Sequence, residues 1–473
     1  MVVDDRTTPA AARSAARVQS PTTIDRLIGE EEERFVARQP RSRELHTRAL
    51  ASLAGGVTSS WQITRPQPVF ISRGHGSKIV DVDGNEYVDF HGGYGAGLAG
   101  HAHPAIVEAA TRQVRNGTHF AQPSEDAVIV AELLAQRFDL PVWRFTNSGT
   151  EATMDAVHLM RAVTDRDLIV KVEGCYHGHH DSVQVSVAPS ESEEIGPAGH
   201  PLGRPASSGI PAAMTRLTLV ATFNDLCSVE RLLDEQPGRI AGMIIEPIMM
   251  NAGIVLPVPG YLEELRSLLH RHGALLCFDE VKTGLTVGPG GATRLLGVAP
   301  DIVCLAKSIG GGLVTGAVGA TDEVMAHVAS GEYEMVGTFN GNPLSMACTR
   351  AVLESVATDA GYERIAALRA RLEVPVNAAI ERHGLRAHLV SVGAKGCITF
   401  ADAPVRNYRD FLLVDDRFNH LHWLVQHNRG VFLPPWGKTE QWMLSVQHGD
   451  GDVDMFVQNF EQFAADAGHA VRA

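Results

Sequence analysis

Short apolar segments alternate with helical patterns between about residues 104 and 319, and this alternation restricts the fold more than any other feature of the chain. The apolar, β-branched segments span residues 168–172, 217–221, 240–245, 274–278 and 301–305. Uninterrupted apolar strands separated by helices are typical of parallel sheets that are covered on both faces. The sequence therefore predicts an α/β fold with a large, doubly wound, mostly parallel sheet.

The segments on either side of this region have different patterns. Residues 1–22 are polar and rich in Arg, Ala and Thr, so we expect a disordered tail. Residues 23–103 contain a helical segment and, around Asp83-Gly84, the alternating pattern of a β-hairpin. Residues 104–343 form the expected sheet domain, and residues 344–473 predict a smaller α+β C-terminal lobe.

Composition excludes several classes of protein. The 473 residues are 44% hydrophobic and 20% charged, which is typical of globular enzymes, and the formal net charge of −14 comes without a basic stripe. We therefore expect no nucleic-acid partner and no anionic membrane partner. The six cysteines contain no Cys-x-x-Cys pair, and no apolar run reaches the length of about 18 residues that a membrane span needs. We expect a soluble protein of the reducing cytoplasm.

The segment from Asn147 to Ala152 follows one strand-like run and precedes a helical one. Its glycine and hydroxyl residues at a helix start could bind a phosphate, because free backbone N–H groups and the helix dipole favour an anion there. The same residues are also an ordinary helix-capping sequence. Both interpretations remain open from this segment alone.

Two further strand ends carry charged residues. Asp279 follows an apolar strand, where a carboxylate needs a cationic partner such as a protonated pyridine nitrogen. Lys307 follows another and precedes Gly310-Gly311-Gly312, so desolvation is expected to lower its pKa and make its amine nucleophilic, unless the side chain only extends to solvent. Tyr176, flanked by glycines, could cover a flat ring. Together these are the parts that a pyridoxal phosphate enzyme needs.

With these residues the chain resembles the class III aminotransferases of PLP fold type I, and most closely their glutamate-1-semialdehyde 2,1-aminomutase subgroup. The resemblance covers residues 55–446, and the matching stretches are Asp81 to Asn85, Gly100 to Pro104, Asn147 to Ala152, Glu173 to Gly178, Glu246-Pro247, Phe278 to Val281, Lys307 with its glycines, and Gly337 to Pro343. It implies pyridoxal 5'-phosphate as cofactor, a small-molecule amino donor and carbonyl acceptor, and a homodimer with shared active sites.

The resemblance also implies a role for each matching residue. Lys307 would form the Schiff base and carry protons, and Asp279 would keep the pyridine nitrogen protonated. The remaining cofactor contacts would be Ser148, Gly149 and Thr150 at the phosphate, Tyr176 and Val281 on the ring, and Thr338 at the phosphate of the neighbouring subunit.

Substrate-binding positions depart from the family pattern. The aminomutases usually have an arginine where this chain has Gln62 and a tryptophan where it has Tyr94. Many 2-oxoglutarate-using members have a glutamate at Asn251 and an arginine near residues 441–444, which read Gln-Trp-Met-Leu here. We therefore expect a site without a cation for a substrate carboxylate, and poor conversion of glutamate-1-semialdehyde.

The leading hypothesis is an aminotransferase that moves an amino group from an amino acid or amine to a carbonyl acceptor. An aminomutase is the first alternative, favoured by the Ser-, Pro- and Gly-rich segment from Ser186 to Met214, which has the composition of a long loop that could retain an intermediate. A non-catalytic PLP-fold binding protein is the second, although Lys307 and Asp279 are both present. The histidines near Cys175 imitate a metal cluster, but neighbours on one loop rarely converge on one ion, so no metal is expected.

Overall fold

A seven-stranded sheet forms the centre of the large domain in the computed structural model, which describes residues 23–190, 195–435 and 441–472. The predicted tail, residues 1–22, lies outside the described residues. The sheet order is β4-β10-β9-β8-β7-β5-β6. The strands are β4 (Val142–Thr146), β5 (Leu168–Val172), β6 (Thr218–Ala221), β7 (Ile240–Ile245), β8 (Leu275–Asp279), β9 (Ile302–Leu305) and β10 (Gly316–Ala320). Only β10 runs antiparallel to its neighbours within this sheet, so the predicted mostly parallel sheet is confirmed.

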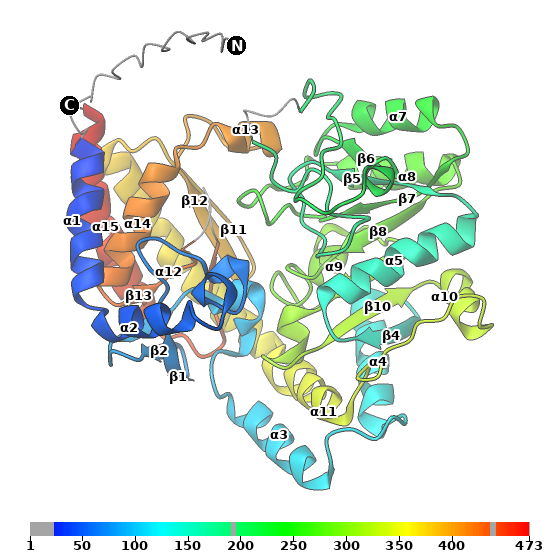
Figure 1. Ribbon diagram of the computed structural model, residues 1–473, viewed down its shortest axis with the longest axis horizontal. Helices are drawn as coiled ribbons and strands as arrows, with labels where there is room; N and C mark the ends of the chain where they lie inside the picture. Colours follow the sequence, from blue (N-terminus) through cyan, green and yellow to red (C-terminus); the bar gives the residue numbers. More distant parts are fainter. Residues whose placement is uncertain (1–22, 191–194, 436–440, 473) are drawn as a thin grey trace, which may run out of the picture.

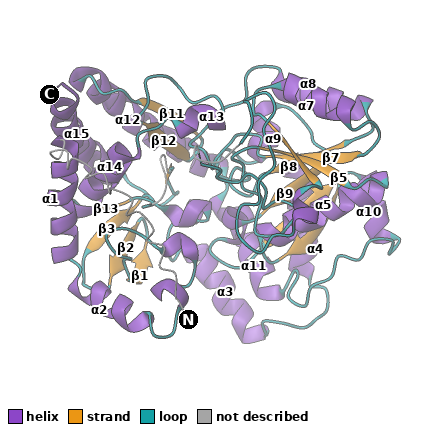
Figure 2. Cartoon of the chain, turned by 45° about the horizontal axis from the view of Figure 1, so that its top comes forward, coloured by secondary structure: helices purple, strands orange, loops and turns teal. Residues whose placement is uncertain are grey.

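Both faces of this sheet are buried because successive strand residues enter different apolar clusters. Ile169 and Cys277 pack beneath α5 in one cluster, and their neighbours Val170 and Phe278 pack in the cluster on the other face. The covering and flanking helices are α3 (Pro104–Asn116), α4 (Glu125–Phe138), α5 (Gly149–Thr164), α6 (Ala212–Thr215), α7 (Leu226–Glu235), α8 (Tyr261–Arg271), α9 (Gly291–Leu296), α10 (Asp322–Ala329) and α11 (Pro343–Ala351). Figure 2 shows the strands enclosed by these helices.

The second lobe is built from both ends of the described chain, and α1 lies along α14 and α15 there (Figure 1). Its helices are α1 (Thr23–Ala37), α2 (Pro40–Ala49), α12 (Asp359–His383), α13 (Tyr408–Leu412), α14 (Asp416–Asn428) and α15 (Asp450–Arg472). Its strands are β1 (Ile71–His75), β2 (Lys78–Asp81), β3 (Glu86–Asp89), β11 (His388–Val392), β12 (Lys395–Thr399), β13 (Val431–Phe432) and β14 (Trp442–Met443). Strand β3 pairs in parallel with β13, so a single sheet joins the two ends.

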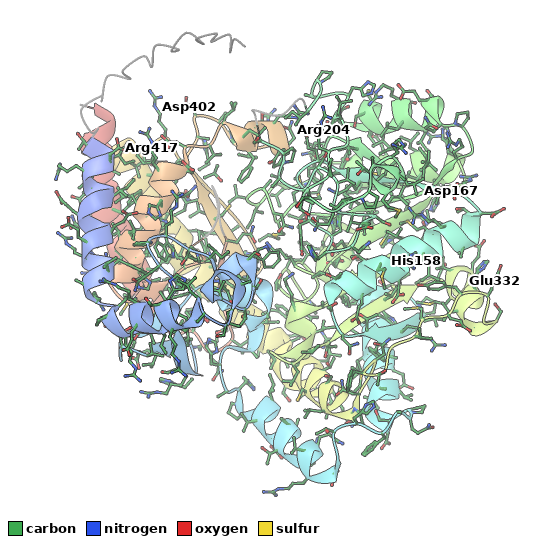
Figure 3. All side chains as sticks on the ribbon, viewed as in Figure 1. His158, Asp167, Arg204, Glu332, Asp402 and Arg417 are labelled. Atoms are coloured by element: carbon green, nitrogen blue, oxygen red, sulfur yellow. The ribbon has the colours of Figure 1, made fainter. Side chains whose placement is uncertain are left out.

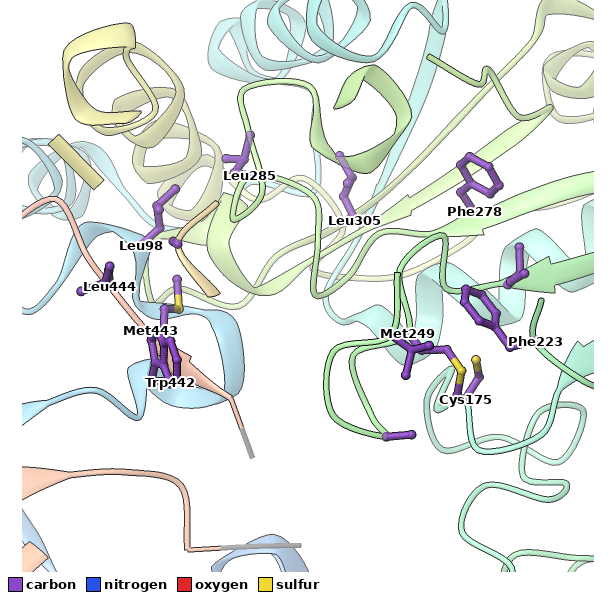
Figure 4. Packing of buried hydrophobic residues seen from close by; sticks show 14 of the residues in the cluster. Leu98, Cys175, Phe223, Met249, Phe278, Leu285, Leu305, Trp442, Met443 and Leu444 are labelled. Carbon is purple, nitrogen blue, oxygen red and sulfur yellow. The ribbon is translucent and has the colours of Figure 1, made fainter. Parts of the chain in front are cut away.

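The predicted hairpin at Asp83-Gly84 is confirmed, because β2 and β3 pair in antiparallel register across that turn. The side chains of both lobes are drawn in Figure 3, with His158 on α5 of the large domain and Arg417 on α14 of the second lobe. One buried apolar cluster includes Leu305 of β9 and Met443 of β14, so apolar packing continues between the lobes. In Figure 4 Leu98 lies beside Met443 and Leu444, and all three are buried. Within the described ranges, no helix combines the length and hydropathy that crossing a bilayer requires.

The parallel strands all end at one edge of the sheet, and the residues that follow them meet there. β8 ends at Asp279, β9 is followed by Lys307, and β4 is followed by Ser148. Loops at the carboxyl edge of an open α/β sheet are the usual place for a ligand site. The fold therefore brings together the charged residues that the sequence singled out.

Candidate active site

A cavity of ≈ 460 Å³ opens at this edge of the sheet, facing the second lobe. Its lining includes Lys307, Asp279, Ser148, Gly149, Thr150, Tyr176, Val281 and Asn251. It also includes Trp61, His177, Glu246, Lys282, Leu313, Val314 and Thr315. The structure thus places eight of the eleven predicted site residues around one space.

Lys307 lies at the start of the short 3-10 helix η5 (Lys307–Gly310), directly after β9. Its φ of 52° is left-handed, a conformation that a residue with a side chain adopts only at a cost on the order of 1–3 kcal/mol. The surrounding protein removes water from the amine, and this desolvation, reinforced by the positive charge of Lys282, lowers the pKa of Lys307 to about 8. This lowering from 10.5 raises the neutral share of the amine at pH 7 by roughly 300-fold, to about a tenth, and the neutral amine can act as a nucleophile.

Asp279 is buried at the end of β8 and has a partner for each carboxylate oxygen. Its Oδ2 lies 2.8 Å from Nδ1 of the buried His177, and its Oδ1 accepts a hydrogen bond from the Val281 N–H at 3.0 Å. These contacts fix the orientation of the carboxylate in the cavity wall. His177 was not among the residues predicted for the site, although it stands next to Tyr176 in the same motif.

The phosphate-binding site predicted at Asn147 to Ala152 lies at the start of a helix, α5, as expected. Ser148 is the N-cap, and its hydroxyl accepts a hydrogen bond from the Glu151 N–H at 3.2 Å. The Thr150 hydroxyl accepts one from the His179 N–H at 3.1 Å, which joins α5 to the loop after β5. A Cβ atom at Gly149 would lie 2.9 Å from both methyl groups of Val281, so glycine is required there for Val281 to pack against the helix start.

Glu246, which follows β7, positions the other side of the cavity. Its carboxylate accepts hydrogen bonds from the Tyr176 N–H at 2.9 Å, the Met250 N–H at 2.7 Å and the Asn251 side-chain amide at 2.7 Å. The ring of Tyr176 packs edge-on against Trp61, with ring centroids 5.2 Å apart. Trp61 and Glu246 therefore shape the cavity, and the sequence patterns did not identify either as a site residue.

The cavity matches the needs of pyridoxal phosphate. Ser148, Gly149 and Thr150 at the helix start line the cavity, and the buried Thr315 hydroxyl has no hydrogen-bond partner among the described residues. A buried, oriented carboxylate suits a protonated ring nitrogen, and a desolvated lysine suits an aldehyde. The residues present fit the cofactor.

Two of the residues expected to contact substrate do not line this cavity. The Gln62 side chain folds back on its own turn, where its Oε1 accepts hydrogen bonds from the Thr58 N–H, the Thr58 hydroxyl and the Ser59 N–H at 3.0, 2.7 and 3.2 Å. The Tyr94 hydroxyl donates to the Trp61 carbonyl at 2.9 Å, and Tyr94 lines a neighbouring hollow. Gln62 is held by local bonds that the sequence pattern does not reveal, and its neighbour Trp61 lines the cavity instead.

Thr338 also lies away from the cavity. It is exposed in a separate hollow of ≈ 420 Å³ that includes Arg144 and Asn340. Thr338 therefore does not line the cavity of its own subunit.

The described residues of the segment from Ser186 to Met214 are anchored to α13. Arg409 of α13 donates to the carbonyls of Ile195 and Gly196, both at 3.0 Å, and Tyr408 donates to the Pro189 carbonyl at 2.8 Å. None of its described residues lines the cavity. The expectation that this loop covers the site stays a prediction.

The histidines that imitate a metal cluster have other contacts. His177 pairs with Asp279, and His180 approaches the Thr153 hydroxyl at 3.3 Å. His101 lies on another segment, where it pairs with Asp89 at 2.6 Å. These histidines are part of the packing around the strand ends.

Comparison with known proteins identifies the family. The family description Aminotransferase class-III matches residues 61–446. Glutamate-1-semialdehyde 2,1-aminomutase of Syntrophomonas wolfei is 38% identical over 431 residues, which are 90% of this chain and 98% of that one. An omega-transaminase from Sphaerobacter thermophilus has a similar structure, with a TM-score of 0.85, 35% identity, and coverage of 91% of this chain and 99% of that chain.

A glutamate-1-semialdehyde-aminomutase from Pseudomonas aeruginosa, solved in complex with PMP, has a TM-score of 0.86 at 28% identity. The similarity covers 94% of this chain and 98% of that chain. The desolvated Lys307, the paired Asp279 and the helix start at Gly149 lie around one cavity of this fold. The chain belongs to the class III aminotransferases of PLP fold type I and is an enzyme that depends on pyridoxal phosphate.

Proposed function

We propose that the enzyme transfers an amino group from an amino donor to a separate carbonyl acceptor. Lys307 carries this proposal, because a desolvated amine in this cavity can bind the cofactor aldehyde and later move a proton. The bound cofactor would supply an electron sink for the bond that is broken at the amino carbon.

The other residues would hold the cofactor and orient its ring. Asp279, fixed by His177 and the Val281 N–H, would keep the ring nitrogen protonated by its negative charge. Ser148, Gly149 and Thr150 would bind the phosphate at the start of α5. Tyr176 and Val281 would pack against the ring and exclude water from it.

Transfer to a second substrate is favoured by the access to the cavity. An aminomutase must keep its intermediate until the amino group has returned, and a closing loop serves this purpose. Here the described part of the 186–214 segment is anchored to α13 and contributes nothing to the cavity wall. The aminomutase remains the second candidate, because relatives with that name are 38% identical to the chain.

The aminotransferase and the aminomutase are distinguished by the reaction of the holoenzyme with a single substrate. When the holoenzyme meets an amino donor without an acceptor, transfer predicts release of one equivalent of carbonyl product per site, followed by a stop. Mass spectrometry of the quenched mixture measures this burst. Sustained conversion of glutamate-1-semialdehyde to the isomer with the amino group on the adjacent carbon, with no donor added, would instead establish the aminomutase.

We also propose a homodimer whose sites are shared. Thr338 lies outside its own cavity, and large apolar side chains are exposed around it, with Val336 81% and Phe339 57% accessible. An apolar surface of this kind is typical of a protein interface. Thr338 of one subunit would then reach the phosphate bound by the other.

Mixing Lys307→Ala subunits with Thr338→Arg subunits is expected to restore activity to roughly a quarter of the wild-type value after subunit exchange, because each mixed dimer has one intact site. Steady-state rates of the mixture and of each inactive parent measure the effect. Exchange shown by native mass spectrometry, with rates that stay at the parental level, would contradict a shared site.

We infer a reducing, cytoplasmic compartment. The cysteines within the described residues are all free thiols, and only Cys227 is exposed. Buried thiols of this kind behave as small apolar side chains, and a reducing compartment preserves them.

A further inference from the structure

The active-site cavity contains a second lysine whose role the cofactor does not explain. Lys282 follows Asp279 by three residues, lines the cavity and is half-buried. Its Nζ donates a hydrogen bond to the Met250 carbonyl at 3.2 Å. An ammonium group has three donor hydrogens, so one carbonyl leaves most of its capacity for another acceptor.

The acidic residues of the cavity are engaged elsewhere. Asp279 contacts His177 and the Val281 N–H, and Glu246 accepts three hydrogen bonds from neighbouring residues. Within the described part of the chain, no carboxylate forms an ion pair with Lys282. A half-buried ammonium without a counter-charge is costly, so this part of the cavity is prepared for an anion that comes from solution.

The position of Lys282 fits a substrate group and not the cofactor phosphate. The Met250 carbonyl that it contacts also accepts a hydrogen bond from the Gln441 side chain, which comes from the second lobe beside β14. Lys282 therefore lies where the cavity meets the second lobe, whereas the phosphate-binding residues begin α5 in the large domain. Its charge also contributes to the lowered pKa of Lys307, so the two amines are near each other.

We propose that Lys282 binds the carboxylate of the substrate. A single cation that pairs with a single carboxylate selects amino acids over simple amines and favours substrates with one carboxylate over dicarboxylates. The apolar side chains of Trp61, Ile248, Leu313 and Val314 line the same cavity, so we expect the rest of the substrate to be apolar. This inference rests on the proposed transfer function and specifies its substrate class as apolar amino monocarboxylates.

Matched substrate pairs test the proposal with the holoenzyme. 3-Aminobutanoate is compared with 2-aminobutane, and alanine with isopropylamine, since each amine has a methyl group in place of the carboxylate. For whichever acid the wild type accepts, Lys282→Met should lower kcat/KM about tenfold or more, mainly through KM, while the value for the matching amine stays within about twofold. Lys282→Arg should recover part of the loss because it restores the charge.

The controls separate binding from other effects of the charge. Lys78→Met removes a surface lysine that pairs with Glu86 and does not line the cavity. It should leave kcat/KM unchanged for both the acid and the matching amine. Loss of Lys282 also changes the electrostatic environment of Lys307, but that change acts on acid and amine alike. An equal decrease for both members of each pair would therefore overturn the carboxylate role.

Binding without turnover provides an independent measurement. Titration calorimetry of butanoate into the holoenzyme should show affinity in the wild type and in Lys282→Arg, and a loss of about tenfold or more in Lys282→Met. If the wild type transfers no amino group from any pair, the proposed function fails, yet the butanoate titration still reports on Lys282. Equal butanoate affinity in wild type and Lys282→Met would overturn the inference even for an active transferase.

Discussion

Turnover is expected to fall by roughly 10⁴-fold or more when Lys307 is replaced by alanine, because the nucleophile and the proton carrier are lost together. The visible absorption that results from covalent attachment of the cofactor to Lys307 should disappear as well. Steady-state rates and an absorption spectrum measure the two effects. Lys78→Ala, on the surface, is the control and should change neither. Activity and colour that survive in Lys307→Ala would refute the assignment.

The same substitution should not weaken the fold of the apoenzyme. The folded pKa of Lys307 is lowered to about 8 from an ordinary value of 10.5, so between these values the unfolded chain holds a proton that the folded chain does not. Stability therefore rises with pH across this window, and below pH 8 the burial of the charged amine opposes folding in full. Alanine removes this cost, and a thermal midpoint equal to or above that of the wild-type apoenzyme is expected near neutral pH.

Asp279→Asn is expected to slow the chemical step by roughly 10²–10³-fold, the range for loss of one preorganised electrostatic contact in a dry site. An amide has nearly the shape of the carboxylate but no charge to hold a proton on the ring nitrogen. Single-turnover rates with the cofactor bound measure this step. Rates near those of the wild type would exclude the proposed role of Asp279.

A second carboxylate in the same sheet offers a matched control. Asp301 precedes β9, pairs with His270 at 2.9 Å and accepts a hydrogen bond from the Leu276 N–H at 2.7 Å, but it lies outside the cavity. Asp301→Asn changes the same chemical group in a similar Asp–His pair. Its single-turnover rate should remain at the wild-type level, which separates the electrostatic role of Asp279 from a general effect on the sheet.

The central sheet and several of the site residues could be predicted from the sequence because their signals are local. A strand that is buried on both faces is apolar throughout, as in residues 240–245, and a charge that follows such a strand is conspicuous. Lys307 and Asp279 stand at such points, and the carboxyl edge of a parallel sheet necessarily gathers them. The glycine at 149 was similarly visible from its position before a helix.

The residues around the substrate space could not be predicted in the same way. The family pattern placed Gln62 at the substrate, but its side chain accepts hydrogen bonds from Thr58 and Ser59 in its own turn. The direction of this side chain depends on the geometry of the loop, which the sequence pattern does not show. The expectation that the family's carboxylate-binding positions lack a cation stays a prediction, and the sequence patterns did not single out Lys282, which lines the cavity. A lysine in a loop is usually solvated, and only the three-dimensional placement of the Met250 carbonyl distinguishes this one.

The pairing of β3 with β13 and the packing of α1 along α14 set an order for biosynthesis. Residues 104–343 are continuous in the chain, so the large domain can collapse on the ribosome as soon as they have emerged. The helix and strands made first must wait for partners that are translated more than 300 residues later, since α14 begins at Asp416. Until then, the apolar face of α1 around Phe35 is exposed to other nascent chains and to chaperones. The lobe that closes the active site is thus the last part of the protein to form.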